Sequence, residues 1–167
     1  GATVIGTVST DEKAKLVKTV GADYIINYVQ NDFETETMRL TGGEGVHAVY
    51  DSVGKTTFDK SIHVLRARGY MIVYGLTSGN VPPFDINRLS GITGSGNKGS
   101  LFLTWATSSD YTSKREDLLW RASDVFSWVA NGSLKVHIAK TFPLAEATKA
   151  HCLVESRKVS GKILLAP

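Results

Sequence analysis

Residues 1–28 read GATVIGTVSTDEKAKLVKTVGADYIINY and contain a strand, a helix and a second strand in close succession. The β-branched run Val4–Val8 is typical of a strand that is buried on both faces. The spacing Ser9-x-x-Glu12 predicts a capping box at the start of a helix, and residues 23–28 predict the next strand. Because parallel strands need a crossover connection, usually a helix, this stretch indicates an α/β fold.

The same alternation continues to residue 105, through a Gly- and Pro-rich connection at residues 75–99. We expect strands at residues 46–51, 69–74 and 100–105, and helices at residues 32–40 and 57–65. The chain is therefore predicted to form a doubly wound parallel sheet, which binds ligands at the carboxyl ends of its strands.

After residue 108 the hydrophobic period becomes helical, and we divide the chain into residues 1–108 and residues 109–167. Ser113-x-x-Glu116 predicts a second capping box, followed by a helix with an apolar face that ends at residues 131–132. The remaining elements are expected to be strands at residues 136–142 and 162–165 and a helix at residues 144–156.

The composition excludes several classes of protein. The 167 residues are 42% hydrophobic and 21% charged, as in a soluble globular domain, and no apolar run is long enough to span a membrane. The net charge of +3 comes from scattered basic residues, so we expect no nucleic-acid partner. The single cysteine, Cys152, cannot form an internal disulfide, which favours a reducing, cytoplasmic location.

Metal and covalent catalysis find little support in the sequence. The four histidines share no metal-ligand spacing, and we expect no metal site and no catalytic residue in this chain. His47 and Cys152 are expected to be buried packing residues. Gly94-x-Gly96-x-x-Gly99 has the letters of a dinucleotide-binding turn, but it precedes a strand instead of following one, so it is rejected.

Further motifs follow residues 1–28 in a fixed order: TGGEGVHAVYDSVG, RGYMIVYGLTSG, GSLFLTW and ESRKVSGKILLAP. Together they resemble the medium-chain dehydrogenases/reductases, and specifically their zinc-independent NADPH:quinone oxidoreductase (zeta-crystallin-like) branch. The resemblance covers residues 1–167. It implies the cofactor-domain portion of an oxidoreductase that transfers hydride from NADPH to a quinone or a related activated carbonyl compound, such as an enone.

In that family, the substrate domain, the first strand and its Gly-rich turn precede the position of Gly1. The chain, which begins without methionine inside an apolar run, is thus expected to be a C-terminal piece. Residues 1–108 would be a partial NADP-binding Rossmann domain, and residues 109–167 would complete it and contact the absent catalytic domain. In the strand order 3-2-1-4-5-6, the strands at 4–8 and 46–51 would flank an empty slot.

The end of the first strand is the expected site of cofactor selection. An NAD-specific site usually has an acid here for the ribose 2′-hydroxyl, whereas this chain has Ser9 and Thr10. The resemblance assigns contacts with the 2′-phosphate of NADP to Lys13, Tyr28 and Arg157. From spacing alone these three are ordinary surface or strand-end residues. Asp11 could also reach a 2′-hydroxyl and weaken the preference for NADP.

The resemblance places further cofactor contacts, near the ribose and the nicotinamide, on three other segments. They are Ser52, Gly54, Gly75, Leu76, Thr77, Ser78, Phe102, Leu103 and Thr104. The alternative for residues 51–54 is a plain strand-to-helix turn, with Thr56 or Thr57 capping the helix. Phe102 could pack in the core, a role that is compatible with a cofactor contact.

The resemblance also implies a homodimer, because family members pair the edge strand at residues 100–105 across a two-fold axis. The helix at residues 114–131 could instead cover this edge. A different function remains open as well, namely a nucleotide-binding or interaction module without catalysis. The residues that precede Gly1 in the full-length protein would distinguish these two functions.

Overall fold

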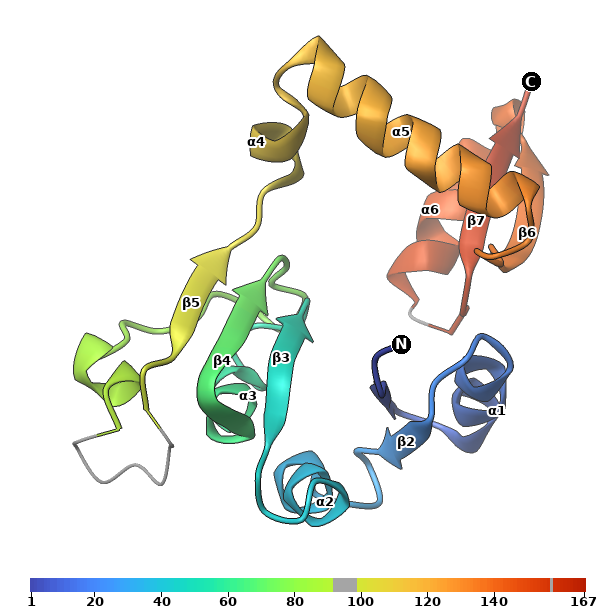
Figure 1. Cartoon of the computed structure of the whole chain (residues 1–167). Helices are drawn as coiled ribbons and strands as arrows, with labels where there is room; N and C mark the ends of the chain where they lie inside the picture. The colour runs from blue at the N-terminus through green and yellow to red at the C-terminus, as the bar shows by residue number, and fades with distance from the viewer. Residues whose placement is uncertain (92–98, 157) are drawn as a thin grey trace. The chain divides into compact units, whose positions relative to one another are not determined.

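The computed structural model describes residues 1–91, 99–156 and 158–167. The chain divides into two compact units, residues 1–111 and 112–167, each described by itself. The first unit contains β1 (Ile5–Val8), α1 (Asp11–Thr19), β2 (Tyr24–Asn27), α2 (Phe33–Leu40), β3 (Val46–Asp51), α3 (Phe58–His63), β4 (Leu65–Val73), the 3-10 helix η1 (Ile86–Leu89) and β5 (Phe102–Trp105) (Figure 1). The short helix α4 (Ser108–Thr112) spans the boundary. The second unit contains α5 (Arg115–Ala130), β6 (Ile138–Pro143), the 3-10 helix η2 (Leu144–Glu146), α6 (Ala147–Glu155) and β7 (Lys162–Ala166).

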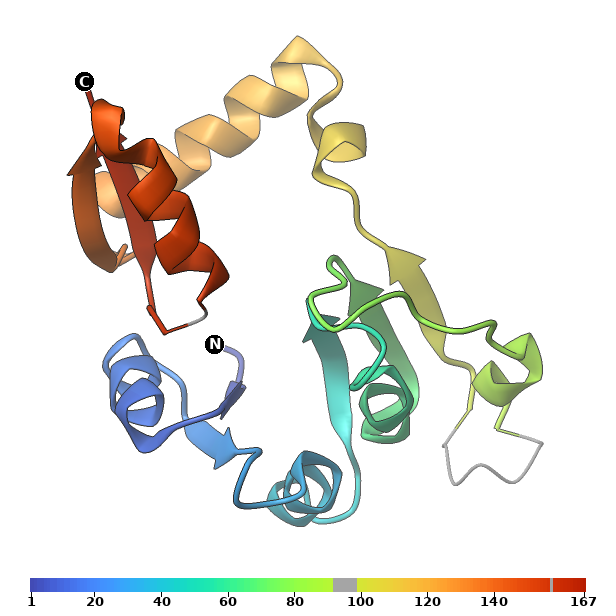
Figure 2. The same ribbon diagram turned by 180° about the vertical axis from the view of Figure 1, so that it is seen from behind.

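All strand pairs are parallel, which confirms the α/β prediction: β1 pairs with β2, β4 lies between β3 and β5, and β6 pairs with β7. Figure 2 shows α3 covering one face of the β3–β4–β5 sheet. Within the described residues β1 and β3 belong to separate sheets. Direct pairing of β1 with β3 would have contradicted the expected empty strand position between them, and the described residues do not show such pairing.

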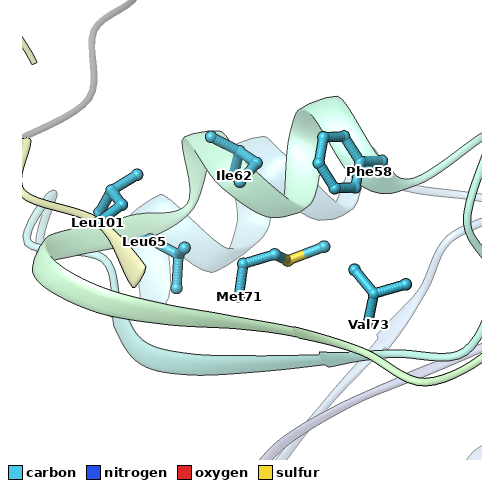
Figure 3. Packing of buried hydrophobic residues seen from close by; sticks show 6 residues of the cluster. All are labelled: Phe58, Ile62, Leu65, Met71, Val73 and Leu101. Carbon is cyan, nitrogen blue, oxygen red and sulfur yellow. The ribbon is translucent and has the colours of Figure 1, made fainter. Parts of the chain in front are cut away.

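The core of the first unit lies between α3 and the β3–β4–β5 sheet (Figure 3). Phe58 and Ile62 are four residues apart on one face of α3, and Met71 and Val73 alternate onto the same face of β4. All four are at most 4% exposed. Each such side chain stabilises the fold by roughly 1.5–3 kcal/mol. This packing fixes the carboxyl ends of β3 and β4.

The strand predicted at residues 69–74 begins earlier than expected, because β4 starts at Leu65 and α3 already ends at His63. Val46 N donates to Val64 O at 2.8 Å and Leu65 pairs with Val46, before a register shift interrupts the ladder. Arg68 lies within this irregularity and has a φ of 60°. Tertiary pairing thus converts the predicted end of the helix into the start of a strand.

Both predicted capping boxes begin one residue too early. The residue that caps α1 is Thr10, whose side chain accepts from Lys13 N at 3.3 Å. Thr10 is still extended, with a φ of −145°, so the helix begins one residue later than expected. Lys114, one residue after Ser113, occupies the cap position of α5 without a side-chain capping bond.

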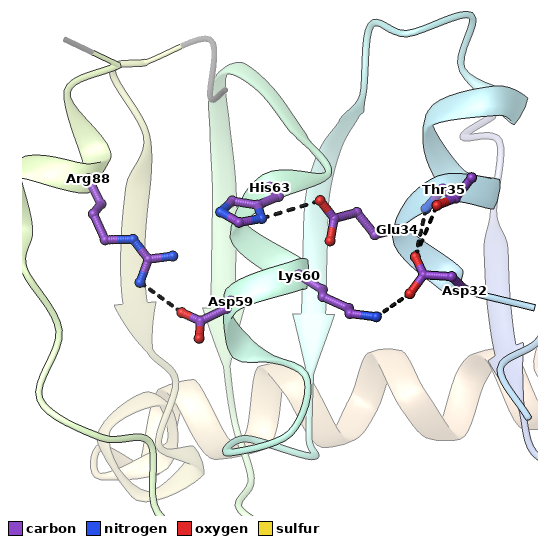
Figure 4. A network of polar contacts seen from close by, with 7 residues as sticks. All are labelled: Asp32, Glu34, Thr35, Asp59, Lys60, His63 and Arg88. Atoms are coloured by element: carbon purple, nitrogen blue, oxygen red, sulfur yellow. Dashed lines mark hydrogen bonds and ion pairs between the residues drawn. The ribbon is translucent and has the colours of Figure 1, made fainter. Parts of the chain in front are cut away.

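Three ion pairs connect α2, α3 and the segment of η1 (Figure 4). They are Asp32–Lys60, Asp59–Arg88 at 2.7 Å and, when His63 is protonated, Glu34–His63 at 3.2 Å. The hydrogen bond from Lys60 lowers the pKa of Asp32 to about 2. Exposed pairs of this kind contribute about 0–1 kcal/mol each, so they add orientation more than stability.

Candidate functional site

Polar and small residues gather at the carboxyl ends of the parallel strands, in two groups. The first group, which we call the β1–β2 end, comprises residues 9–13 with Asn27 and Tyr28. The second group, the paired loops, comprises residues 51–57 after β3 and residues 74–79 after β4. Ends of parallel strands are the usual place for a ligand in such sheets.

The paired loops are joined by backbone hydrogen bonds. Tyr74 N donates to Asp51 O, Thr77 N to Ser52 O, Ser78 N to Val53 O, and Lys55 N to Gly79 O, at 2.9–3.2 Å. The hydroxyl of Ser78 donates to Val53 O at 2.7 Å and accepts from Thr56 N at 3.1 Å. Ser78, one of the predicted cofactor contacts, therefore uses its side chain to connect the two loops.

Two predicted site glycines allow the loops to approach each other. Gly54 has a φ of +85°, and a Cβ on it would lie 2.8 Å from Leu76 Cδ2 and 2.9 Å from Gly79 O. A Cβ on Gly75 would lie 2.7 Å from Ser52 O. Both positions exclude any larger residue without movement of the backbone.

Asp51 holds the loop after β3 in place, a role that the sequence analysis did not assign to it. Its side chain is buried (4% exposed). One carboxylate oxygen accepts from Val53 N at 2.7 Å and Gly54 N at 3.0 Å, and the other from Thr57 Oγ1 at 2.7 Å and Ser61 Oγ at 3.0 Å. Thr57, at the cap position of α3, makes no capping bond itself and donates to Asp51 instead. The sequence signal for this arrangement is an acid at the end of a strand, Asp51, with Gly54 three and Thr57 six residues later.

The β1–β2 end presents side chains to solvent. Lys13 Nζ donates to Ser9 Oγ at 3.2 Å, and both residues are partly buried. Tyr28 is 51% exposed and follows β2, with its N donating to Val8 O at 2.9 Å. The carboxylate of Asp11 accepts from Asn27 Nδ2 at 2.9 Å. Ser9, Lys13 and Tyr28 thus lie at one end of two paired strands, as predicted.

The structure places three further predicted residues on β5. Phe102, Leu103 and Thr104 are exposed on β5, which pairs with β4 and, within residues 1–91, 99–156 and 158–167, with no other strand. The core-packing alternative for Phe102 is wrong: its ring is 50% exposed and stacks on Tyr70 at 4.5 Å, while Leu101 enters the core. Arg157 lies outside the described residues, as does most of the rejected Gly94–Gly99 motif.

The expectation that His47 and Cys152 are buried is wrong, because both are exposed. On α6 the buried residue is Ala150, two positions before Cys152 and on a different side of the helix. In the ranges that the structure describes, no cluster of three or more His, Cys, Asp or Glu residues could hold a metal ion. No described helix is long and apolar enough to cross a membrane.

A family profile described as "Zinc-binding dehydrogenase" matches residues 20–165. The chain belongs to this family. The 2-haloacrylate reductase of a Burkholderia species is 42% identical over 167 residues, which are 100% of this chain and 49% of that protein. Quinone oxidoreductase 1 of Escherichia coli is 38% identical over 100% of this chain and 50% of its own length.

Solved structures of the family agree with the fold. The E. coli quinone oxidoreductase complexed with NADPH has a TM-score of 0.90 at 38% identity and covers 100% of this chain and 50% of its own. A mycobacterial protein complexed with NADPH has a TM-score of 0.87 at 41% identity. The match covers 99% of this chain and 49% of the mycobacterial chain. This member of the zinc-binding dehydrogenase family therefore spans about half the length of the relatives it matches.

Proposed function

We propose that the chain is the cofactor-domain portion of an oxidoreductase that transfers hydride from NADPH to a quinone or a related activated carbonyl compound. The observation that carries the proposal is the Lys13–Ser9 contact at the carboxyl end of β1, at 3.2 Å. An ammonium group beside a hydroxyl, where an NAD site usually has an acid, fits the 2′-phosphate of NADPH. Relatives solved with NADPH support this assignment.

The paired loops would hold the opposite end of the cofactor. In this proposal Ser52, Gly54 and residues 75–78 face the nicotinamide and its ribose through the backbone, together with residues 102–104 of β5. The close approach of the loops at Gly54 and Gly75 supports a rigid backbone surface of this kind. NADPH supplies the hydride, so the protein needs to bind and orient the cofactor and exclude water.

The contributions of the two halves of the chain follow from the same proposal. Residues 1–108 would form a partial NADP-binding domain, and residues 109–167 would complete it and contact a catalytic domain. Because orientation of the substrate is worth several orders of magnitude in rate, this chain alone should be inactive. NADPH oxidation with a panel of quinones should not exceed the rate without protein, and clear turnover would contradict this division.

We further propose a cytoplasmic homodimer that pairs through β5. Its one-sided pairing and the exposure of Phe102, Leu103 and Trp105, at 39–52%, support an edge that a second copy extends. Light scattering at micromolar concentration should detect a dimer that Leu103→Lys dissociates. A monomer whose behaviour is unchanged by that substitution would exclude pairing through this edge.

The central experiment substitutes Lys13 in the full-length enzyme. Loss of a charge-assisted hydrogen bond costs roughly 1.5–3 kcal/mol, so Lys13→Ala should weaken NADPH binding by on the order of ten- to hundredfold. NADH binding should remain nearly unchanged. Lys15→Ala, an exposed lysine on the same helix, is the matched control and should change neither affinity. Equal weakening of both cofactors by Lys13→Ala would make Lys13 structural, and cofactor binding without turnover would favour a non-catalytic module.

A further inference from the structure

Asp11 places a carboxylate at the first residue of α1, two positions from Lys13. Its Oδ1 accepts a hydrogen bond from Asn27 Nδ2 at 2.9 Å. The other end of the same amide is also occupied, because Asn27 Oδ1 accepts from Val29 N at 3.2 Å. The backbone of Val29 thus orients the Asn27 amide so that its NH2 group faces Asp11.

Neighbouring opposite charges are held by different partners here. Lys13 Nζ donates to Ser9 Oγ, whereas Asp11 is bound by Asn27. Among the residues described, no ion pair joins Asp11 to Lys13. A released Asp11 carboxylate would be free to turn toward the cofactor and accept a ribose 2′-hydroxyl. Its charge would then repel a 2′-phosphate at the same position.

We propose that Asn27 is a specificity-determining positioning residue, which holds Asp11 away from the 2′-phosphate position and so keeps the site selective for NADPH over NADH. This inference rests on the proposed function. It assigns a role in cofactor selection to Asn27, which contacts no cofactor atom in the proposed arrangement. The device depends on the β1–β2 pairing, in which Asn27 lies opposite Val8.

A purely structural role makes a different prediction. If the Asn27–Asp11 hydrogen bond only connected α1 to β2, its loss would weaken NADPH and NADH binding to the same extent. Selection through charge instead changes the ratio of the two affinities, and this change should shrink as the ionic strength rises. The ratio and its salt dependence therefore separate the two roles.

The test is a double-substitution cycle in the full-length enzyme, with NADPH and NADH affinities measured by fluorescence titration at low and high salt. Asn27→Ala should weaken NADPH binding about threefold, as expected for screened exposed charges, and leave NADH unchanged or slightly tighter. Asp11→Asn should leave NADPH binding unchanged or make it slightly tighter, because Asn27 already holds this carboxylate away from the 2′-phosphate position. In the Asp11→Asn background, Asn27→Ala should have no further effect on the ratio. Asn31→Ala, an exposed asparagine just beyond β2, is the control.

An unchanged ratio for Asn27→Ala, or an effect that persists without the Asp11 carboxylate, would overturn the inference. Lys13→Ala separates this failure from that of the proposed function. If Lys13→Ala weakens NADPH selectively while Asn27→Ala does not, only the role of Asn27 falls. If Lys13→Ala weakens both cofactors equally, the phosphate site and the role of Asn27 fall together.

Discussion

The paired loops and the β1–β2 end both lie at the carboxyl ends of parallel strands, but they are built differently. In the paired loops the polar groups form hydrogen bonds with one another or with nearby residues of the protein. Asp51, for example, is 4% exposed and accepts four hydrogen bonds. At the β1–β2 end, exposed side chains such as Asp11 and Tyr28 are held by few contacts. The comparison indicates that the loops contribute a fixed shape, whereas the β1–β2 end contributes charge. Substitutions should therefore cost stability in the loops and selectivity at the β1–β2 end.

The largest effect on stability is expected for Asp51→Ala. It removes the acceptor of two backbone N–H groups and two hydroxyls in a buried position, and the free energy of unfolding should fall by about 3 kcal/mol or more. Urea denaturation measures this loss. Ser61→Ala is the matched control, because it removes a single donor from the same carboxylate and should cost about 1 kcal/mol. Equal costs for the two variants would mean that the Asp51 network does not hold the loops.

The next effect tests the close approach of the loops. Gly54→Ala introduces a Cβ at φ +85° against Leu76 and Gly79 O, and should destabilise the protein by about 2–3 kcal/mol. Gly43→Ala separates the two causes, because Gly43 has a φ of +82° with nothing within 4 Å of an added Cβ. This control should cost about 1 kcal/mol. If both variants lose the same stability, backbone conformation alone explains Gly54, and the close contact contributes nothing.

These two regions also differ in how far the sequence predicts them. The β3 strand was predicted with its exact bounds, because an apolar run between turn residues leaves few alternatives. Ser9 is predicted from its place at the end of the first strand, and Lys13 and Tyr28 through a family resemblance. Their common location follows from parallel pairing. The Asp11–Asn27 contact joins residues 16 positions apart and depends on strand register. The early start of β4 at Leu65 likewise depends on its pairing with β3, which no local pattern encodes.

A smaller effect on stability is expected at the contact between α2 and α3. The hydrogen bond from Lys60 lowers the pKa of Asp32 from 3.8 to about 2. Since the folded-state pKa is depressed, the stabilisation is present above about pH 4 and is lost as the pH falls toward 2. Both side chains are at least 40% exposed, so solvent screens the pair, and Lys60→Met should lower the free energy of unfolding only slightly at neutral pH. Denaturation at several pH values should show the difference from wild type vanish near pH 2, with Lys15→Met as control. A difference independent of pH would assign the cost to packing of the lysine stem.

The smallest effect on stability is expected at the β1–β2 end, from Ser9→Ala. Thr10 and not Ser9 caps α1, so the helix keeps its cap and the free energy of unfolding should change by less than about 0.5 kcal/mol. The substitution does remove the acceptor that holds Lys13 Nζ. A less restrained lysine should bind the 2′-phosphate more weakly, and we expect NADPH affinity to fall about threefold while NADH affinity stays constant. Thr10→Ala is the comparison variant, because loss of the α1 cap should lower the free energy of unfolding by about 1 kcal/mol. If Ser9→Ala destabilised the protein as much as Thr10→Ala, the β1–β2 end would resemble the paired loops, and the distinction between shape and charge would fail.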